Sequence, residues 1–228
     1  TADISMSDSF QSSTPYTSPA LTDTIVGVVG FTWAKSVSSA DVPAASYNRL
    51  TNINLQQAQA LLTNGAVPLS FITGNSADDA YDVVVTGRDN DSGTRVTAFA
   101  ETGFGVASSP TQYSINTSTG ALTVFSSTSG YAGGGDVKTA LLAAIPSGAV
   151  SPNAVPYILV SYLGIGDDPD PTGANNQKLT YNGVAYDVTA IQEGKYSFWG
   201  YEHMFYRSSL TDTVQLQAAA DVVAQIGA

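Results

Sequence analysis

The chain contains no cysteine and one histidine among its 228 residues. The absence of cysteine excludes disulfides, thiolate chemistry, iron–sulfur clusters and cysteine-ligated zinc. Because His203 is alone, a multi-histidine metal site is impossible and a Ser-His-Asp triad would depend on this one residue. No Gly-x-Ser-x-Gly elbow accompanies it. We therefore interpret His203 as a strand residue and predict a protein that is not an enzyme and holds no cofactor or metal.

Charge is scarce as well. Charged residues make up 12% of the chain, and the eight lysines and arginines stand singly against nineteen aspartates and glutamates, giving a net charge of -11. No basic patch can neutralise phosphates in series, which argues against nucleic acid and anionic lipid as partners. A small anion is still compatible with this charge, because helix dipoles and one arginine can overcome a distant, salt-screened field.

Long hydrophobic runs are also missing, since none approaches the roughly 18 residues that a membrane helix needs. The plentiful polar residues are neutral Ser, Thr and Asn, which suggests an exported protein. The start, Thr1-Ala2-Asp3, has no initiator methionine and no charged or apolar leader. We expect a secreted chain, periplasmic or extracellular, whose signal peptide is already absent.

Strand-like and helix-like patterns alternate, which predicts an α/β fold. Strands are expected at residues 3–7, 24–35, 81–86, 112–116, 121–125, 157–163, 179–181, 184–186 and 198–206, with hairpins joining 112–116 to 121–125 and 179–181 to 184–186. Helices are expected at 55–63, from the Ser92 cap to about 101, and at 137–145, 189–192 and 211–226, while 68–71 should be a short connection. The hydrophobic fraction of 43% suffices for one large domain or two small lobes.

The octet GRDNDSGT at residues 87–94 carries the clearest chemical signal. It follows an apolar strand and precedes a helix, whose first turn leaves about four N–H donors free and carries a partial positive charge. Ser92 is a typical N-cap, Gly93 lets the backbone approach closely, Thr94 adds a hydroxyl, and Arg88 offers a planar fork of donors. The octet therefore predicts an oxyanion site, although an ordinary capped helix with a solvent-facing arginine gives the same pattern.

A second polar cluster lies in the loop that begins at residue 167. Asp167, Asp168 and Asp170, with Asn175 and Asn176, supply the oxygen atoms that calcium prefers. The spacing matches no EF-hand, and solvated turns give such clusters more often. We therefore predict no metal site there.

Several segments, in one order, resemble the phosphate-binding proteins of bacterial ABC transporters. They are ADISMSD at 2–8, the helix ending at Asn64-Gly65, RDNDSGT at 88–94, the glycine-rich helix start at 133–135, YNGV at 181–184 and IQEGKY at 191–196. The resemblance covers nearly the whole chain. It implies a type II periplasmic binding protein-like fold, in which two α/β lobes close over a dehydrated oxyanion, here inorganic phosphate. It also implies the membrane subunits of an ABC transporter as partners.

The resemblance assigns phosphate binding to Asp8, Arg88, Ser92, Gly93 and Thr94. Asp8 matches the carboxylate that accepts a proton from phosphate. A buried carboxylate repels fully ionised sulfate but can hydrogen-bond a protonated phosphate. Without the family, Asp8 has the simpler interpretation of an aspartate that caps a turn.

Asn90 departs from the family pattern, which has an aspartate there to hold the arginine. Its loss leaves Arg88 less fixed, unless Asp89 or Asp91 takes over that role.

The family also has about fifty more residues before the segment that matches Asp3. On this basis lobe one, residues 1–31 plus 198–228, is incomplete, and lobe two is residues 32–197. So small a lobe one cannot bury a two-faced sheet. We expect the missing part to lie outside this sequence or to come from a second chain or self-association.

The favoured interpretation is thus an exported phosphate-binding protein. The alternative is a structural subunit of an extracellular surface layer or filament, built on the same scaffold and completed by a neighbouring chain. Low charge, abundant Ser, Thr and Tyr, and Asn90 all agree with that alternative.

Overall fold

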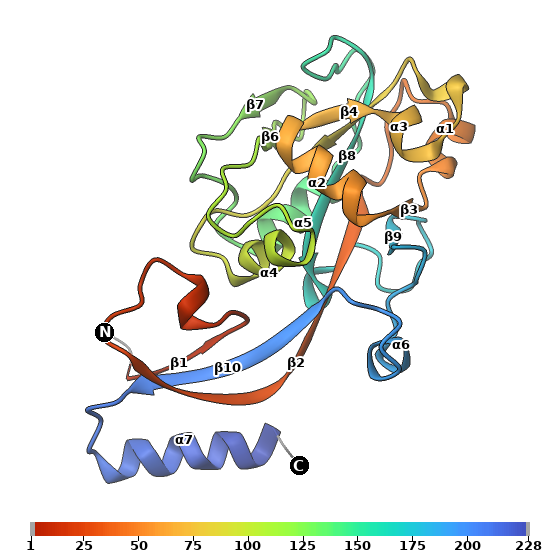
Figure 1. The fold of residues 1–228 in the computed structure, drawn as a ribbon. Coiled ribbons are helices and arrows are strands. Elements are labelled where there is room, and N and C mark those ends of the chain that lie inside the picture. The colour runs from red at the N-terminus through yellow and green to blue at the C-terminus, as the bar shows by residue number, and fades with distance from the viewer. Residues whose placement is uncertain (1–2, 227–228) are drawn as a thin grey trace.

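One long strand, β2 (Leu21–Lys35), joins the two parts of the fold in this computed structural model, which describes residues 3–226 (Figure 1). Residues 21–30 of β2 pair antiparallel with β10 (Trp199–Arg207), and residues 31–35 pair antiparallel with β8 (Tyr157–Gly164). A single strand therefore carries the chain from one part of the sheet into the other.

The described strands form an eight-stranded sheet and a separate hairpin. The order of the main path is β1 (Ile4–Ser7), β10, β2, β8, β5 (Asp82–Val85), β4 (Ala66–Pro68). Beside this path, β9 (Lys178–Tyr181) pairs with β2 and with β3 (Asn52–Ile53). The hairpin consists of β6 (Tyr113–Ile115) and β7 (Leu122–Val124).

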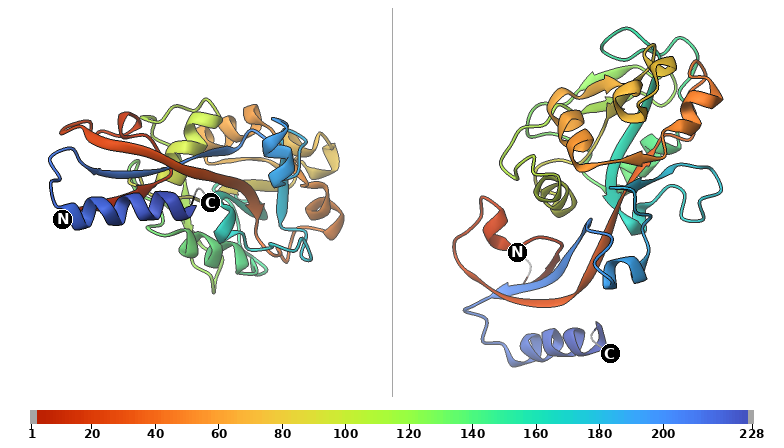
Figure 2. Two further views of the ribbon diagram at one scale, coloured as in Figure 1. Left: turned by 90° about the horizontal axis from the view of Figure 1, so that it is seen from below. Right: turned by 45° about the vertical axis from the view of Figure 1, so that its right-hand side comes forward.

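Helices surround the sheet, as the views in Figure 2 show. They are α1 (Ala44–Arg49), α2 (Leu55–Asn64), α3 (Leu69–Thr73), α4 (Gly93–Glu101), α5 (Gly134–Leu142), α6 (Val188–Gln192) and α7 (Thr213–Ile226). Short 3-10 turns occur at Gln11–Ser13, Ser76–Asp78 and Ile165–Asp167. Within the described residues, no helix is both long and apolar enough to cross a membrane.

The parallel strands β5 and β8 are buried on both faces, as expected for strands covered by helices on each side. Val83 and Val85 face a core to which α2 and α4 contribute Leu61 and Phe99. The intervening Val84 faces a second core on the α5 side. This two-sided packing fixes the end of β5, and so the loop before α4, in position.

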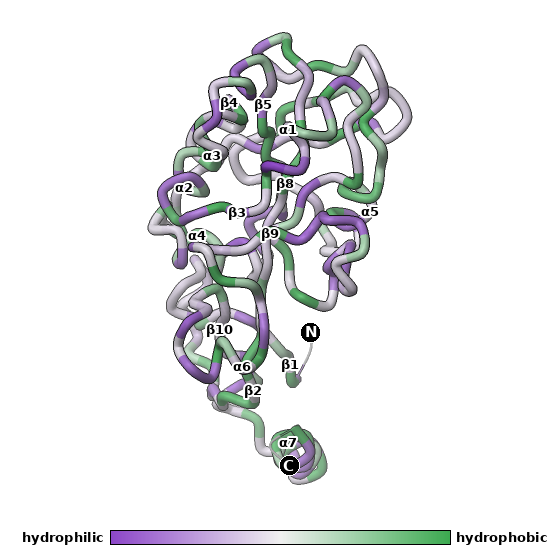
Figure 3. Tube along the Cα trace, turned by 90° about the vertical axis from the view of Figure 1, so that its right-hand side faces the viewer, coloured by the Kyte–Doolittle hydropathy of each residue, from purple (hydrophilic) through white to green (hydrophobic). Residues whose placement is uncertain are grey.

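The part built from β1, β10 and the first half of β2 has a much smaller core. Val26, Met204 and Ala219 form its buried cluster, with α7 lying along one face of these strands. Figure 3 shows both hydrophobic and hydrophilic stretches on α7. Ile25 and Val28 of β2 are more than half exposed, at 52% and 54%. The division into lobes at 1–31 plus 198–228 and 32–197 stays a prediction.

Two expectations about local structure are wrong. Residues 184–186 form no strand, because Val184 makes one isolated bridge to Tyr181, whose strand pairs with β3 and β2 instead. The expected connection at 68–71 contains the end of β4 and the start of α3. In addition, α5 begins and ends about three residues earlier than predicted, because the Asp136 carboxylate accepts a hydrogen bond from the Gly133 N–H and caps the helix there.

Candidate functional site

The site is built around the start of α4. The buried strand β5 ends at Val85, and the following loop turns into the helix at Gly93. Ser92 is the N-cap, and its hydroxyl accepts a hydrogen bond from the Arg95 N–H at 3.3 Å. The N–H groups of Gly93 and Thr94 have no hydrogen-bond partner among the described residues. The helix start therefore presents free N–H donors and a partial positive charge to any group that lies against it.

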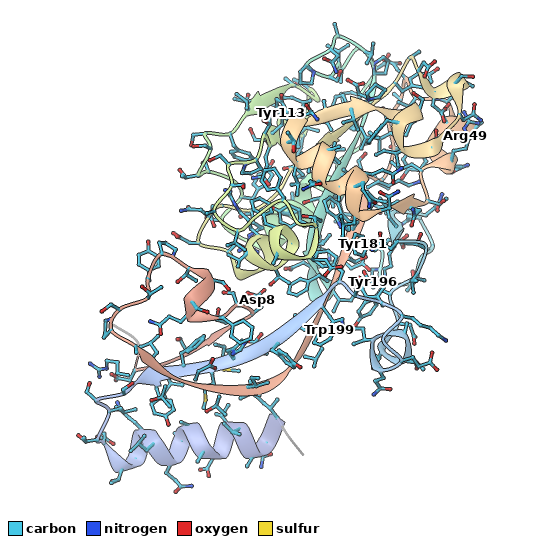
Figure 4. All side chains as sticks on the ribbon, in the orientation of Figure 1. Asp8, Arg49, Tyr113, Tyr181, Tyr196 and Trp199 are labelled. Carbon is cyan, nitrogen blue, oxygen red and sulfur yellow. The ribbon has the colours of Figure 1, made fainter. Side chains whose placement is uncertain are left out.

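Asp8 lies against this helix start. It follows β1, which pairs with β10, and Figure 4 shows it between the β10 strand and α4. The Thr94 hydroxyl donates to Oδ2 of Asp8 at 3.1 Å, and the Thr97 hydroxyl donates to the Asp8 carbonyl oxygen at 3.0 Å. A Cβ added to Gly93 would lie only 1.5 Å from Asp8 Oδ1. Only glycine at position 93 lets the carboxyl reach the helix so closely.

The Asp8 carboxyl is half-buried, and burial is the main reason that its pKa is raised above the usual value. The hydrogen bond from Thr94 and the charge of Arg88 oppose this effect and lower the pKa in part. Burial therefore favours the protonated form of this carboxyl more than full exposure to water would.

Arg88 is held by main-chain oxygens. Its Nε donates to the Tyr131 carbonyl at 3.2 Å and its Nη2 to the Ala132 carbonyl at 2.8 Å. Gly130 permits this close packing, because a Cβ there would lie 2.2 Å from the Arg88 carbonyl carbon. Neither Asp89 nor Asp91 forms an ion pair with Arg88 in the described part of the chain. Two backbone carbonyls therefore hold the arginine, a solution that the sequence does not reveal.

Arg95 is a residue that the sequence analysis missed. It is 5% exposed, and its Nη1 and Nη2 donate to the carbonyls of Arg88 and Ser127, each at 3.1 Å. Burial lowers the pKa of Arg95, and no carboxylate pairs with it among the described residues. Its position in the first turn of a capped helix gave no indication that it would be buried and bonded to main-chain carbonyls.

The other candidate clusters have structural roles. Asp168 pairs with Lys178 at 2.6 Å, and Asp170 accepts hydrogen bonds from the backbone N–H groups of Asn175 and Gln177. These carboxylates close the loop in which they lie. His203 is buried in β10 beside Asp23, at 2.8 Å. No group of three or more His, Asp or Glu residues in the described ranges is arranged to hold a metal ion.

Comparison with known proteins relates this arrangement to solved structures. No family model and no curated protein sequence matches the chain. One similar solved structure is a protein from Clostridium perfringens assigned as a phosphate ABC transporter substrate-binding protein, with bound phosphate. It matches with a TM-score of 0.58 and 14% sequence identity, and the match covers 99% of this chain and 78% of that protein. The ABC-type phosphate transport receptor from Vibrio cholerae matches with a TM-score of 0.51 and 14% sequence identity. That match covers 99% of this chain and 79% of the receptor chain. This chain has the phosphate-receptor fold.

The ancestral soluble variant of the human phosphate binding protein has the same phosphate-receptor fold, with a TM-score of 0.51 and 12% identity over 97% of this chain and 70% of its own. The expectation of an α/β, type II periplasmic binding protein-like fold is confirmed. The roles of Asp8, Arg88, Ser92, Gly93 and Thr94 stay predictions.

Proposed function

We propose that this chain binds an inorganic oxyanion, preferably phosphate, at the start of α4, through Asp8, Arg88, Ser92, Gly93 and Thr94. One observation carries the proposal: the Asp8 carboxyl meets Thr94 at 3.1 Å and lies directly against Gly93, where helix N–H groups are free. The partial positive charge of a helix start favours a carboxyl by itself, and a receptor for a protonated anion needs the carboxyl and the helix N–H groups in one place.

The pairing of donors with one acceptor explains a preference for phosphate. The helix N–H groups and the positive charge of Arg88 attract any tetrahedral anion, and the Thr94 hydroxyl holds Asp8 beside them. Asp8 distinguishes among anions, because it accepts a hydrogen bond from a protonated phosphate and repels sulfate, which has no proton near neutral pH. The raised pKa of Asp8 favours such a shared proton.

The phosphate-receptor fold supports a place for this protein outside the cytoplasm, either periplasmic or extracellular, where it delivers its ligand to the membrane subunits of an ABC transporter. The comparisons lend no support to the alternative of a surface-layer or filament subunit. They also give none to completion of lobe one by self-association or by a second chain.

Calorimetric titration with phosphate and with sulfate tests the proposal. We expect phosphate to bind at least tenfold more tightly than sulfate. Asp8→Asn should remove that preference, since an amide can donate to sulfate and loss of a charged hydrogen bond costs about 1.5–3 kcal/mol, or roughly 10- to 100-fold in Kd. Asp79→Asn, at an exposed position outside the site, is the matched control and should retain the preference. Equal binding of the two anions by the parent protein, or an unchanged preference in Asp8→Asn, would contradict the proposal.

A further inference from the structure

The main chain of Arg88 is held from two sides. On one side Arg88 makes an isolated parallel bridge to Tyr131, through the carbonyl of Gly87 and the N–H of Asp89. In such a bridge the N–H and the carbonyl of the central residue point the opposite way. On that opposite side, no strand of the described structure pairs with residue 88. Buried side chains satisfy the peptide groups of Arg88 there instead.

Tyr162 and Gln112, both buried, close a ring of hydrogen bonds on this residue. The Arg88 N–H donates to the Tyr162 hydroxyl at 3.3 Å, and that hydroxyl donates to Oε1 of Gln112 at 2.7 Å. Nε2 of Gln112 donates in turn to the Arg88 carbonyl oxygen at 3.2 Å. Each member therefore accepts one hydrogen bond and donates one, and a break at any point leaves buried polar groups without partners.

The ring is mounted on rigid parts of the larger core. Tyr162 belongs to the buried strand β8, and its aromatic ring makes edge contacts with Trp33 and Phe99, at centroid distances of 5.7 and 6.0 Å. Gly87 makes room for the ring, because a Cβ there would lie 2.2 Å from Gln112 Oε1 and 2.6 Å from the Tyr162 hydroxyl oxygen. The hydroxyl therefore has a fixed position against the segment that carries Arg88.

The position of the Arg88 guanidinium depends on this main-chain geometry. Its Nε and Nη2 reach the carbonyls of Tyr131 and Ala132 at 3.2 and 2.8 Å, and a shift of the Arg88 main chain would lengthen both hydrogen bonds. A binding group has to be held to within about 0.5 Å of its productive geometry by the residues behind it. The hydrogen-bond ring behind Arg88 meets that requirement without contact to the anion.

We propose that Tyr162 and Gln112 are positioning residues of the anion site: they fix the main chain of Arg88, and so its guanidinium, before the anion arrives. This inference rests on the proposed function and adds to it two residues that lie behind the site. The ring acts on the positive charge that attracts any tetrahedral anion. It does not act on the Asp8 carboxyl, which distinguishes phosphate from sulfate.

Calorimetry of Tyr162→Phe with phosphate and with sulfate tests this inference. The change removes the hydroxyl and keeps the aromatic ring. We expect the Kd for both anions to rise by the same factor, roughly tenfold or more, so that the preference for phosphate is retained. Tyr157→Phe is the matched control, because it removes another buried hydroxyl from β8, one that donates to the Gly120 carbonyl at 2.6 Å. This control should lose a similar amount of Tm and keep both Kd values.

A second variant breaks the ring at another point. Gln112→Met removes the amide with little change of volume and should weaken binding as Tyr162→Phe does. A ring that is broken once no longer fixes the peptide, so the double variant should bind no more weakly than the weaker single variant. Amide hydrogen exchange adds a measurement that needs no ligand. The Arg88 N–H should exchange faster in Tyr162→Phe than in Tyr157→Phe.

The outcomes separate this inference from the proposed function. Parent-like phosphate binding by Tyr162→Phe and Gln112→Met overturns the inference and leaves the proposed function intact, and so does an equal loss of affinity in Tyr157→Phe. A parent protein that binds neither anion overturns both. Loss of the phosphate preference in Tyr162→Phe would show that the ring does not act through Arg88. If Tyr162→Phe does not fold, Gln112→Met carries the same expectations.

Discussion

Replacing Gly93 by alanine tests the geometry of the site most sharply. The added Cβ would lie 1.5 Å from Asp8 Oδ1 and 2.7 Å from its Cγ, distances that non-bonded atoms do not reach. The carboxyl has to withdraw by about 1.5 Å, since contacts under 3.0 Å essentially never occur for a Cβ. The Asp8 main chain cannot follow freely, because the Thr97 hydroxyl holds its carbonyl oxygen at 3.0 Å.

The carboxyl of Asp8 therefore turns away and loses its hydrogen bond to Thr94. A phosphate at the helix start then also loses its hydrogen bond to the Asp8 carboxyl, and because a hydrogen bond to a charged group contributes about 1.5–3 kcal/mol, we expect the Kd for phosphate to rise roughly 10- to 100-fold. Alanine is the better helix former by about 1 kcal/mol, which offsets part of the crowding. The Tm should accordingly change little while the affinity for phosphate falls.

Gly135→Ala provides the control, because it makes the same change in the first turn of α5, where an added Cβ meets nothing within 4 Å. Its phosphate affinity should equal that of the parent. Calorimetry and thermal unfolding on the three proteins measure both quantities. If Gly93→Ala binds phosphate as tightly as the parent, the contact between Asp8 and the helix start has no part in binding.

Two further predictions concern stability and its dependence on pH. Asp78 is buried and accepts hydrogen bonds from Arg49, which hold the pKa of its carboxyl far below the usual value. Asp78→Ala should lower the free energy of unfolding, measured by urea titration, by about 3–5 kcal/mol at pH 7. This loss should shrink as the pH falls below about 4, where the carboxyl of the unfolded chain is protonated. The control Asp79→Ala, at an exposed position, should change the free energy of unfolding little. Burial lowers the pKa of Lys35 from 10.5 to about 8, so its charged form opposes folding and stability should rise with pH between about 8 and 10.5. Lys35→Met should abolish that rise and Lys195→Met, at an exposed position, should keep it; equal slopes in the two variants would refute the assignment.

Locally coded features were predictable from the sequence. Asn54 caps α2 by accepting a hydrogen bond from the Gln57 N–H, and Gly65 ends the helix with a positive φ of 77°, as the Asn-Gly pair indicated. The start of α4 at Ser92 and Gly93 was predictable for the same reason. Each of these signals acts within about four residues of the chain.

Features that depend on distant contacts were not predictable. Helices α1 and α3, of six and five residues, are too short for a helical period to show, and each has a proline, Pro43 or Pro68, at its N-cap position. Tyr186 forms no strand, and its ring packs against the face of Gly30, which lies more than 150 residues earlier in the chain. Tertiary packing, and not local sequence, determines the secondary structure of these segments.

The candidate site shows the same contrast. The helix start and its glycine could be proposed from one octet, whereas the partners of Arg88 are the carbonyls of Tyr131 and Ala132, more than 40 residues away. Every residue has a main-chain carbonyl, so the amino-acid sequence does not show which carbonyls will accept a hydrogen bond. The sequence could therefore show that Asn90 replaces the expected aspartate, but not what holds Arg88 instead. The buried Arg95 escaped notice for the same reason, since its partners are also carbonyls.

A crystal structure of the protein grown with phosphate tests the central claim most directly. The account predicts a tetrahedral anion within hydrogen-bond distance of the Gly93 and Thr94 N–H groups, of the Arg88 guanidinium and of an Asp8 oxygen. An anion bound elsewhere, or a helix start still empty at saturating phosphate, would contradict it.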